Sequence, residues 1–233
     1  MRTTLIIFAL LLSVPHNAMA GLDTGLVGYW PMDTRDTPWS SATAAVTIDR
    51  SSSGNTGTLT SMNRATSPVV GKIGQALKFD GVDDYVTAGD VSALRPSTVT
   101  VCAWARRSAA ATNEGIVSTW VDDTGYLLWN DTSGNFSFPI NAATHLSSGI
   151  ALTVGAWFHL CGTFDGTTAR TYVNGVFKTQ AADTLTYTAN QQFNIGRYAN
   201  LDTTEFTGSI DDVRIYNRAL SAGEVNQIYR QGL

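Results

Sequence analysis

Apolar and polar positions alternate in short runs along most of the chain, and turn signals separate these runs. Residues 75–80 alternate and then turn at Gly81, and residues 98–104 are apolar or neutral on both sides. Period-2 alternation is typical of strands, and a run without a polar side indicates a central strand of a sandwich. Asn174-Gly175 lies between two such runs and predicts a hairpin with a type I′ turn, because both residues tolerate positive φ angles. Roughly a dozen strands are predicted in this way.

The last part of the chain predicts one short helix. Ser221 and Glu224 have the spacing of a capping box, in which each side chain bonds a free backbone N–H of the other residue. Leu220 and Val225 flank the box as a hydrophobic staple, and Gly232 is a stop signal. No Pro-rich or charged linker interrupts the pattern. We therefore expect one all-β domain over residues 21–233, built as an antiparallel two-sheet sandwich with a short C-terminal helix.

The first twenty residues have the organisation of a secretory signal peptide. Arg2 precedes an apolar run over residues 5–14, and Ala18-Met19-Ala20 ends the segment. The run is about ten residues long, shorter than the roughly 20 that cross a bilayer as a helix. We expect cleavage near Ala20 and a secreted or periplasmic mature chain that begins at residue 21.

Charge is sparse along this chain. Charged residues make up 15% of the sequence, the formal net charge is −4, and no basic stretch stands out. Nucleic acid and anionic membranes are therefore not expected as partners. Beyond the leader, no apolar segment is long enough to predict a transmembrane helix.

The chain has two cysteines, Cys102 and Cys161, and each lies in a strand-like run. In an oxidising compartment such a pair is expected to form a disulfide, and two buried free thiols are the alternative. No C-x-x-C motif or Cys/His cluster indicates a metal or redox role.

Three segments in this order carry a family resemblance: residues 25–30 with 49–58, residues 74–86, and residues 206–221 running into Glu224. Together they resemble the laminin-G-like jelly-roll domains of the concanavalin A-like lectin and glucanase superfamily, over about residues 25–231. The pattern of His159, Cys161 and Thr163 with Cys102 upstream is similar to the pentraxin signature. This resemblance implies a jelly roll and the same Cys102–Cys161 disulfide.

Residues 49–58 are dense in oxygen-bearing side chains and glycine, which suits calcium. The candidate ligands are Asp49, Asn55, Gly57, Thr58 and Asp211. Period-2 alternation places Asp211 on the face of Val213 and Ile215, where a carboxylate is costly unless it is paired or metal-bound. Related jelly-roll domains hold calcium with matching aspartates, so the resemblance also implies a structural calcium. The alternative is an Asx-turn at Asp49 and a hydrogen-bonded Asp211.

Two loops combine aromatic rings with polar side chains, as carbohydrate sites do. The candidate ligand contacts are Trp120, Asp122, Asp123, Tyr126, Arg197, Tyr198, Asn200 and Asp202. Asp122-Asp123 sits where pentraxins carry part of a ligand-binding calcium site, whereas Arg197-Tyr198 departs from the second half of that site. The alternative is that Trp120 and Trp129 belong to the core and the charges form a solvated rim.

Catalysis is not expected. Glycosidases use two carboxylates that flank the scissile bond, and hydrolases of this fold present them from one strand as Glu-x-Asp-x-Glu or Glu-x-Asp-x-x-Glu. The three glutamates are Glu114, Glu205 and Glu224, and none lies in that pattern. The sequence thus indicates a secreted, non-catalytic module that binds a glycan or cell-surface ligand. The alternatives are an adhesive module with a protein partner and, third, a glycoside hydrolase.

Overall fold

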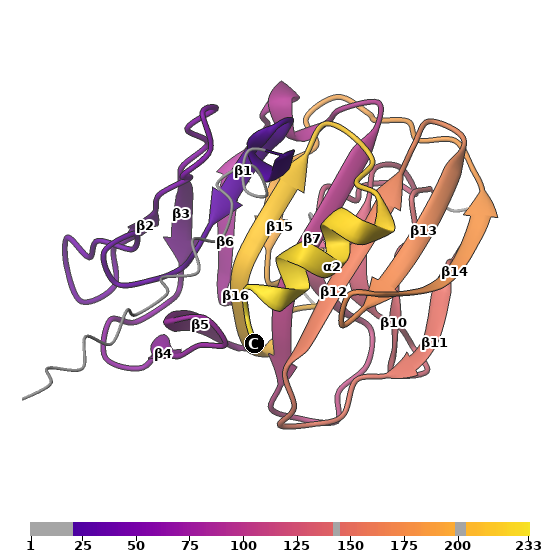
Figure 1. The fold of residues 1–233 in the computed structure, drawn as a ribbon. Coiled ribbons are helices and arrows are strands. Elements are labelled where there is room, and N and C mark those ends of the chain that lie inside the picture. Colours follow the sequence, from indigo (N-terminus) through magenta and orange to yellow (C-terminus); the bar gives the residue numbers. More distant parts are fainter. Residues whose placement is uncertain (1–20, 142–144, 199–203) are drawn as a thin grey trace, which may run out of the picture.

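The computed structural model describes residues 21–141, 145–198 and 204–233 of the chain. Within these residues, sixteen strands form two antiparallel sheets and a short helix follows the last strand (Figure 1). The predicted all-β sandwich with a C-terminal helix is therefore confirmed.

The first sheet runs in the order β14-β13-β12-β7-β16-β5-β4, and β1 also pairs with β16. Its strands are β1 Leu26–Trp30, β4 Pro68–Val70, β5 Gln75–Asp80, β7 Val99–Arg107, β12 Phe158–Phe164, β13 Thr168–Val173, β14 Val176–Ala182 and β16 Thr207–Tyr216.

The second sheet runs in the order β11-β10-β9-β8-β15-β6-β3-β2. Its strands are β2 Val46–Thr47, β3 Gly57–Thr60, β6 Tyr85–Gly89, β8 Glu114–Ser118, β9 Leu127–Asn130, β10 Asn135–Ser137, β11 Ser147–Ala151 and β15 Phe193–Ile195. A single 3-10 turn, η1 Ser92–Leu94, leads from β6 towards β7.

The core lies between the inner faces of the two sheets. In β7, the alternate residues Val99, Val101 and Ala103 face this core, as the sequence pattern predicts. Trp30 of the first sheet stacks on Phe193 of the second, with 4.9 Å between ring centroids. Both rings are buried, so this contact removes a large apolar area from water on each side of the interface.

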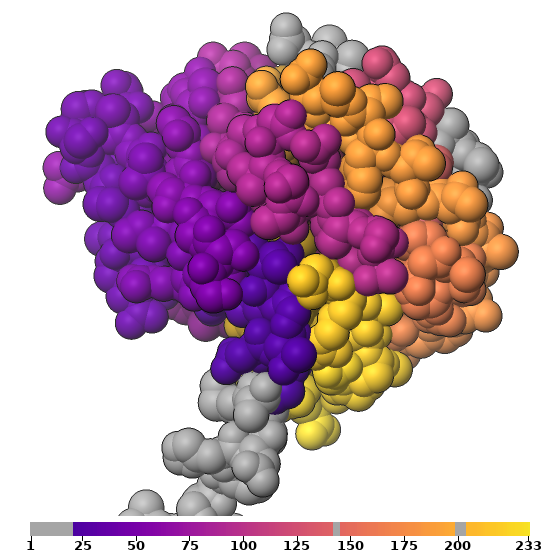
Figure 2. Space-filling model, turned by 90° about the horizontal axis from the view of Figure 1, so that it is seen from above, coloured from indigo at the N-terminus to yellow at the C-terminus, as the bar shows by residue number. Residues whose placement is uncertain are grey.

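The helix α2, Ala222–Arg230, covers part of the outer face of the first sheet (Figure 1). The predicted capping box is present, because Ser221 Oγ accepts from the Glu224 N–H and the Glu224 carboxylate accepts from the Ser221 N–H. Val225 and Ile228 face the sheet and are fully buried. Figure 2 shows the helix beside the first described residues of the chain, where Arg218 donates a hydrogen bond to the carbonyl of Gly21.

The hairpin between β13 and β14 has the predicted type I′ turn. Asn174 and Gly175 have φ angles of 52° and 72°, and Val173 pairs directly with Val176. A side chain at Gly175 would also meet Tyr229 and Asn226 of α2 at 2.8 to 2.9 Å. The turn therefore needs glycine for its backbone angle and for the approach of the helix.

A β-bulge in β16 changes the face on which Asp211 lies. Asp211 pairs with Trp104 and Arg214 pairs with Cys102, so three steps along β16 match two along β7, and Asp212 has a φ of 51°. The extra residue shifts the alternation, so Asp211 lies on the outer face with Arg214 while Val213 and Ile215 face the core. The prediction that Asp211 shares a face with Val213 and Ile215 is wrong for this reason.

Candidate functional site

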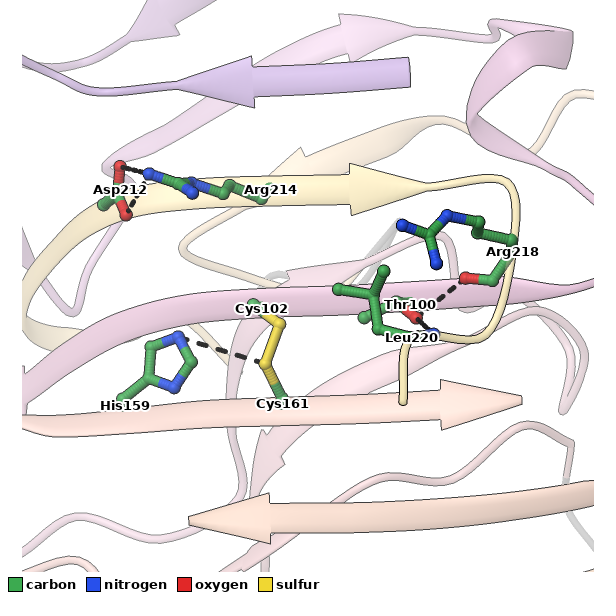
Figure 3. The surroundings of a disulfide bond; sticks show 8 residues. All are labelled: Thr100, Cys102, His159, Cys161, Asp212, Arg214, Arg218 and Leu220. Carbon is green, nitrogen blue, oxygen red and sulfur yellow. Dashed lines mark hydrogen bonds and ion pairs between the residues drawn. A yellow bond between two sulfur atoms is a disulfide. The ribbon is translucent and has the colours of Figure 1, made fainter. Parts of the chain in front are cut away.

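The predicted disulfide between Cys102 and Cys161 is present. The two residues lie directly opposite each other on β7 and β12, with their Cα atoms 4.2 Å apart (Figure 3). Both are fully buried beneath α2 on the outer face of the first sheet. His159 lies beside the bond, and complete burial lowers its pKa to about 3. His159 is therefore a neutral, packed side chain.

Asp49 organises a turn through hydrogen bonds to backbone groups. One carboxylate oxygen accepts from the N–H groups of Tyr29 and Ser51, and the other accepts from the Asn55 N–H and the Ser51 hydroxyl, all within 2.8 Å. Four donors fill the lone-pair sites of an ionised carboxylate. Asn55 takes part in the same structure, since its amide donates to the Val27 carbonyl.

Asp211 holds a different segment. One of its oxygens accepts from the N–H groups of Lys72 and Ile73, both at 2.8 Å, and the other is buried without a hydrogen-bond partner in the described part of the chain. Burial raises the pKa of this carboxyl to about 7. Asp49 and Asp211 thus bind separate loops and share no donor, and the saturated Asp49 carboxylate does not suit a calcium shell. Calcium binding by the predicted ligands stays a prediction, and Asp211, with one oxygen unpartnered among the described residues, is the carboxylate available for it.

Two of the predicted ligand contacts meet in one aromatic cluster. Trp120 and Tyr198 pack with Leu127 and Trp129 of β9, and the Trp129 and Tyr198 ring centroids are 6.0 Å apart. All four side chains are at least nine-tenths buried. Leu127 and Trp129 alternate with the core residue Leu128, so the cluster lies on the outer face of the second sheet.

The other predicted contacts have different environments. Asp122 and Asp123 form an exposed tight turn with φ angles of 47° and 60°. Tyr126 is completely buried in the core, and its hydroxyl donates to the Leu94 carbonyl at 2.8 Å, so it is not available to a ligand. The prediction for Tyr126 is wrong because the segment that leads into β9 directs this side chain into the core between the two sheets. Asn200 and Asp202 lie outside the described residues.

Arg197 joins the aromatic cluster to the centre of the second sheet. Its guanidinium stacks on the Tyr85 ring of β6, 3.4 Å from the ring centroid. Its backbone carbonyl carbon lies so close to Gly115 that a Cβ there would sit 2.4 Å away. Glycine in β8 therefore allows the segment that carries Arg197 and Tyr198 to lie against the sheet.

Three buried polar atoms in this region have no hydrogen-bond partner among the described residues: Trp129 Nε1, Asn194 Oδ1 and Arg197 Nε. They come from β9, from β15 and from the segment after β15, on either side of β8. Buried polar groups are normally bonded to protein, water or a ligand. This face therefore has two hydrogen-bond donors and one acceptor without a partner among the described residues.

A cavity that the sequence did not indicate adjoins the aromatic cluster. It has a volume of about 340 Å³, and its lining includes Asn113, Glu114 and Glu205. The Tyr198 hydroxyl donates to Asn113 Oδ1 at 3.4 Å, which connects the cavity to the cluster. Glu114 accepts from the Thr207 N–H and from the Asn130 amide. The contacting residues are up to 93 positions apart, so no local pattern predicts the cavity.

A group of three carboxylates, Asp80, Asp83 and Asp84, lies at the turn between β5 and β6, with oxygen atoms within 4.8 Å of one another. Asp80 accepts from the Val82 N–H, and Asp84 accepts from the Asp80 N–H. Burial of Asp84 next to Asp80 raises the pKa of Asp84 to about 6. These bonds identify the group as part of the turn structure.

No helix in the described ranges is long and apolar enough to cross a membrane.

Comparisons with known structures support the fold. Domain 4 of AbnA, a GH43 extracellular arabinanase from Geobacillus stearothermophilus in complex with arabinotriose, is 22% identical with a TM-score of 0.68, over 88% of this chain and 98% of that one. The binding domain of Paraclostridial Mosquitocidal Protein 1 is 15% identical with a TM-score of 0.67, over 90% of this chain and 53% of that one. Trypanosoma rangeli sialidase in complex with the inhibitor DANA is 16% identical with a TM-score of 0.63, over 88% of this chain and 33% of that one.

These similarities extend to both binding domains and enzymes, and at such identities they describe the fold alone. No curated protein matches the chain. The family model for the concanavalin A-like lectin/glucanases superfamily, Laminin_G_3, matches residues 80–226, which is more than half of the sequence. The matched range includes the cysteine pair, the aromatic cluster and the capped start of the helix, and the chain belongs to this family.

Proposed function

We propose that the mature chain is a secreted, non-catalytic module that binds a saccharide on the outer face of the second sheet. The observation that carries the proposal is the group of unpartnered polar atoms, Trp129 Nε1, Asn194 Oδ1 and Arg197 Nε, beside the Arg197–Tyr85 stack. Sugar hydroxyls both donate and accept hydrogen bonds, so they complement a mixed set of donors and acceptors.

The aromatic cluster gives this face its rigidity. Trp120, Trp129 and Tyr198 are nearly buried, so they hold the site in shape, and the half-exposed Tyr85–Arg197 pair is the surface that meets a ligand. The guanidinium covers one face of the Tyr85 ring, so a ligand there meets the Arg197 guanidinium, which donates hydrogen bonds to sugar hydroxyls. A pre-formed site of this kind binds without a large ordering cost.

Secretion is supported by the leader sequence and by the disulfide, which persists in oxidising compartments. The contacts of the Glu114 carboxylate support a non-catalytic role. Its two oxygens bind Thr207 and Asn130, and Arg107 lies 3.5 Å from one of them. A carboxylate held by three partners is not arranged to transfer a proton or attack a sugar.

The test is binding of the mature chain to a panel of neutral and acidic glycans that includes arabino-oligosaccharides, followed by calorimetry on the strongest ligand. Trp129→Phe removes the indole donor and keeps an aromatic ring, and Arg197→Ala removes the stacked guanidinium. We expect each change to weaken binding at least about tenfold, or about 1.4 kcal/mol. Arg170→Ala is the matched control, because Arg170 lies on the other sheet and pairs with Asp165.

An unchanged affinity in both variants would overturn this assignment of the site. Binding to a protein partner that no glycan inhibits would favour the adhesive alternative. Release of reducing sugar from any panel member would establish a hydrolase instead.

A further inference from the structure

A second tryptophan site lies at the opposite edge of the second sheet. Trp39 precedes β2, the edge strand, and four strands separate β2 from β9, which carries Trp129. Trp39 is half-buried and borders two hollows, with volumes of about 200 and 500 Å³. The smaller hollow is also lined by Met32, Thr34, Thr37, Arg64, Pro68 and Leu77. This region is separate from the proposed saccharide face.

The segment that carries Trp39 is fixed by backbone and ionic contacts. The Ile48 N–H donates to the Asp36 carbonyl at 2.7 Å, and Trp39 forms a β-bridge with Ala45. The Asp36 side chain is completely buried and forms ion pairs with Arg35 and Arg50. The Ile48–Asp36 hydrogen bond and the Trp39–Ala45 bridge fix the backbone of this loop before any ligand arrives. A loop that is already ordered lowers the entropy cost of binding.

Arg64 supplies positive charge next to the indole ring. Its N–H donates to the Ala42 carbonyl at 2.8 Å, which ties Arg64 to the Trp39 loop, and its exposed side chain lines the smaller hollow with Trp39. Arg64 forms no ion pair with any residue that the structure describes. A guanidinium without a carboxylate partner matches a carboxylate of a ligand, to which it donates two parallel hydrogen bonds.

The larger hollow has a mixed lining. Pro38, Ala44 and Leu59 provide apolar surface, whereas Ser40 and Thr43 place exposed hydroxyls at its margin. An aromatic ring with apolar surface and nearby hydroxyls suits a ligand that has C–H faces and several hydroxyl groups. A saccharide has both, and an acidic saccharide also provides the carboxylate that Arg64 lacks.

We propose that Trp39 and Arg64 form a second binding site for a saccharide that carries a carboxylate, such as a uronic acid unit. The indole stacks on the sugar ring, and the Arg64 guanidinium binds the carboxylate. The overall charge of the chain is −4, so binding of an acidic ligand depends on this local charge and weakens as salt screens it.

The experiment is a titration of the ¹⁵N-labelled mature chain with trigalacturonate, followed through the indole N–H resonances. Trp39→Phe identifies the Trp39 signal, and the methyl ester of the same trisaccharide is the neutral control ligand. We expect the acid to shift the Trp39 signal and the ester to bind at least about tenfold more weakly. Arg64→Gln is expected to abolish this difference, while Arg106→Gln, which alters the Arg106–Trp157 pair, is expected to preserve it.

The two sites are distinguished by Arg197→Ala, which is expected to leave the Trp39 titration unchanged. No shift of the Trp39 signal, or equal shifts with acid and ester, would overturn the proposal. A shift that depends on protein concentration alone would mean that a second copy of the chain occupies the hollow, and would also overturn it.

Discussion

Replacement of Asp211 by asparagine tests whether this buried carboxyl is a destabilising group or a metal ligand. In the folded chain its pKa is raised from 3.8 to about 7 because the side chain is buried. Protonation therefore favours the folded state. The stabilisation is fully present below about pH 4 and is lost as the pH rises through about 7.

The size of the effect follows from the change in pKa. A difference of about three units at 1.36 kcal/mol per unit corresponds to about 4 kcal/mol of unfolding free energy between low and high pH. Asparagine has the same shape, and its amide oxygen is able to accept from the Lys72 and Ile73 N–H groups. The variant should therefore keep the loop contacts and lose the pH-dependent penalty.

The measurement is urea unfolding by tryptophan fluorescence in calcium-free buffer at about pH 3.5 and about pH 8.5. We expect Asp211→Asn to be close to the wild type at the lower pH and more stable by up to about 4 kcal/mol at the higher pH. Asp23→Asn, at an exposed position, should show no such pH-dependent difference. An equal difference at both pH values would refute the reasoning.

The same variant tests calcium. Ligand binding to the folded state alone raises stability by mass action. If millimolar calcium stabilises the wild type at the higher pH and has no effect on Asp211→Asn, Asp211 is a calcium ligand and the carboxyl is ionised. We expect no contribution from Asp49→Asn to calcium binding, because four donors already occupy the Asp49 carboxylate.

Three further predictions concern stability. Replacing both disulfide cysteines with alanine should lower the unfolding free energy by about 4 kcal/mol, since the bond joins positions 59 apart, and a loss below about 1 kcal/mol in denaturant titrations would contradict this. Gly115→Ala should lower the unfolding free energy by about 1 to 3 kcal/mol, because the new Cβ displaces Arg197, and it should weaken glycan binding in calorimetry. The control is Gly223→Ala, which has nothing within 3.8 Å of the new Cβ and should leave both quantities unchanged. Glu224→Ala should lower the melting temperature through a loss of about 1 kcal/mol, because it removes the reciprocal bonds to Ser221, and an unchanged melting temperature would show that the cap is dispensable.

The fold could be predicted from the sequence because its signals are local. Period-2 alternation, the Asn174-Gly175 turn and the Ser221 capping box each depend on neighbouring residues, and all three are present in the structure. The bulge at Asp212 could not be predicted, since nothing in the local sequence distinguishes a bulged Asp-Asp pair from a regular strand. This single insertion placed Asp211 on the opposite face from the one expected.

The candidate site was harder to predict because it depends on contacts between distant segments. Trp120 and Tyr198 meet in one cluster, whereas Tyr126, just before β9, is directed into the core between the sheets. The cavity at Glu114 and Glu205 forms where the start of β16 meets the start of β8, joined by the hydrogen bond from the Thr207 N–H to Glu114. Trp39 offers one usable signal, a tryptophan in a loop rich in hydroxyl groups, but a single aromatic ring in such a loop does not by itself indicate a binding site.

A saccharide that binds at the outer face of the second sheet should change the environment of the Trp129 indole. The most direct measurement is the indole N–H resonance of Trp129 during titration with the strongest glycan from the panel. We expect a saturable downfield shift as Trp129 Nε1 acquires an acceptor, with the same affinity as in calorimetry and no such shift in Arg197→Ala. If no glycan of the panel binds, or if a bound glycan leaves the Trp129 resonance unchanged, the proposed saccharide site on this face is wrong.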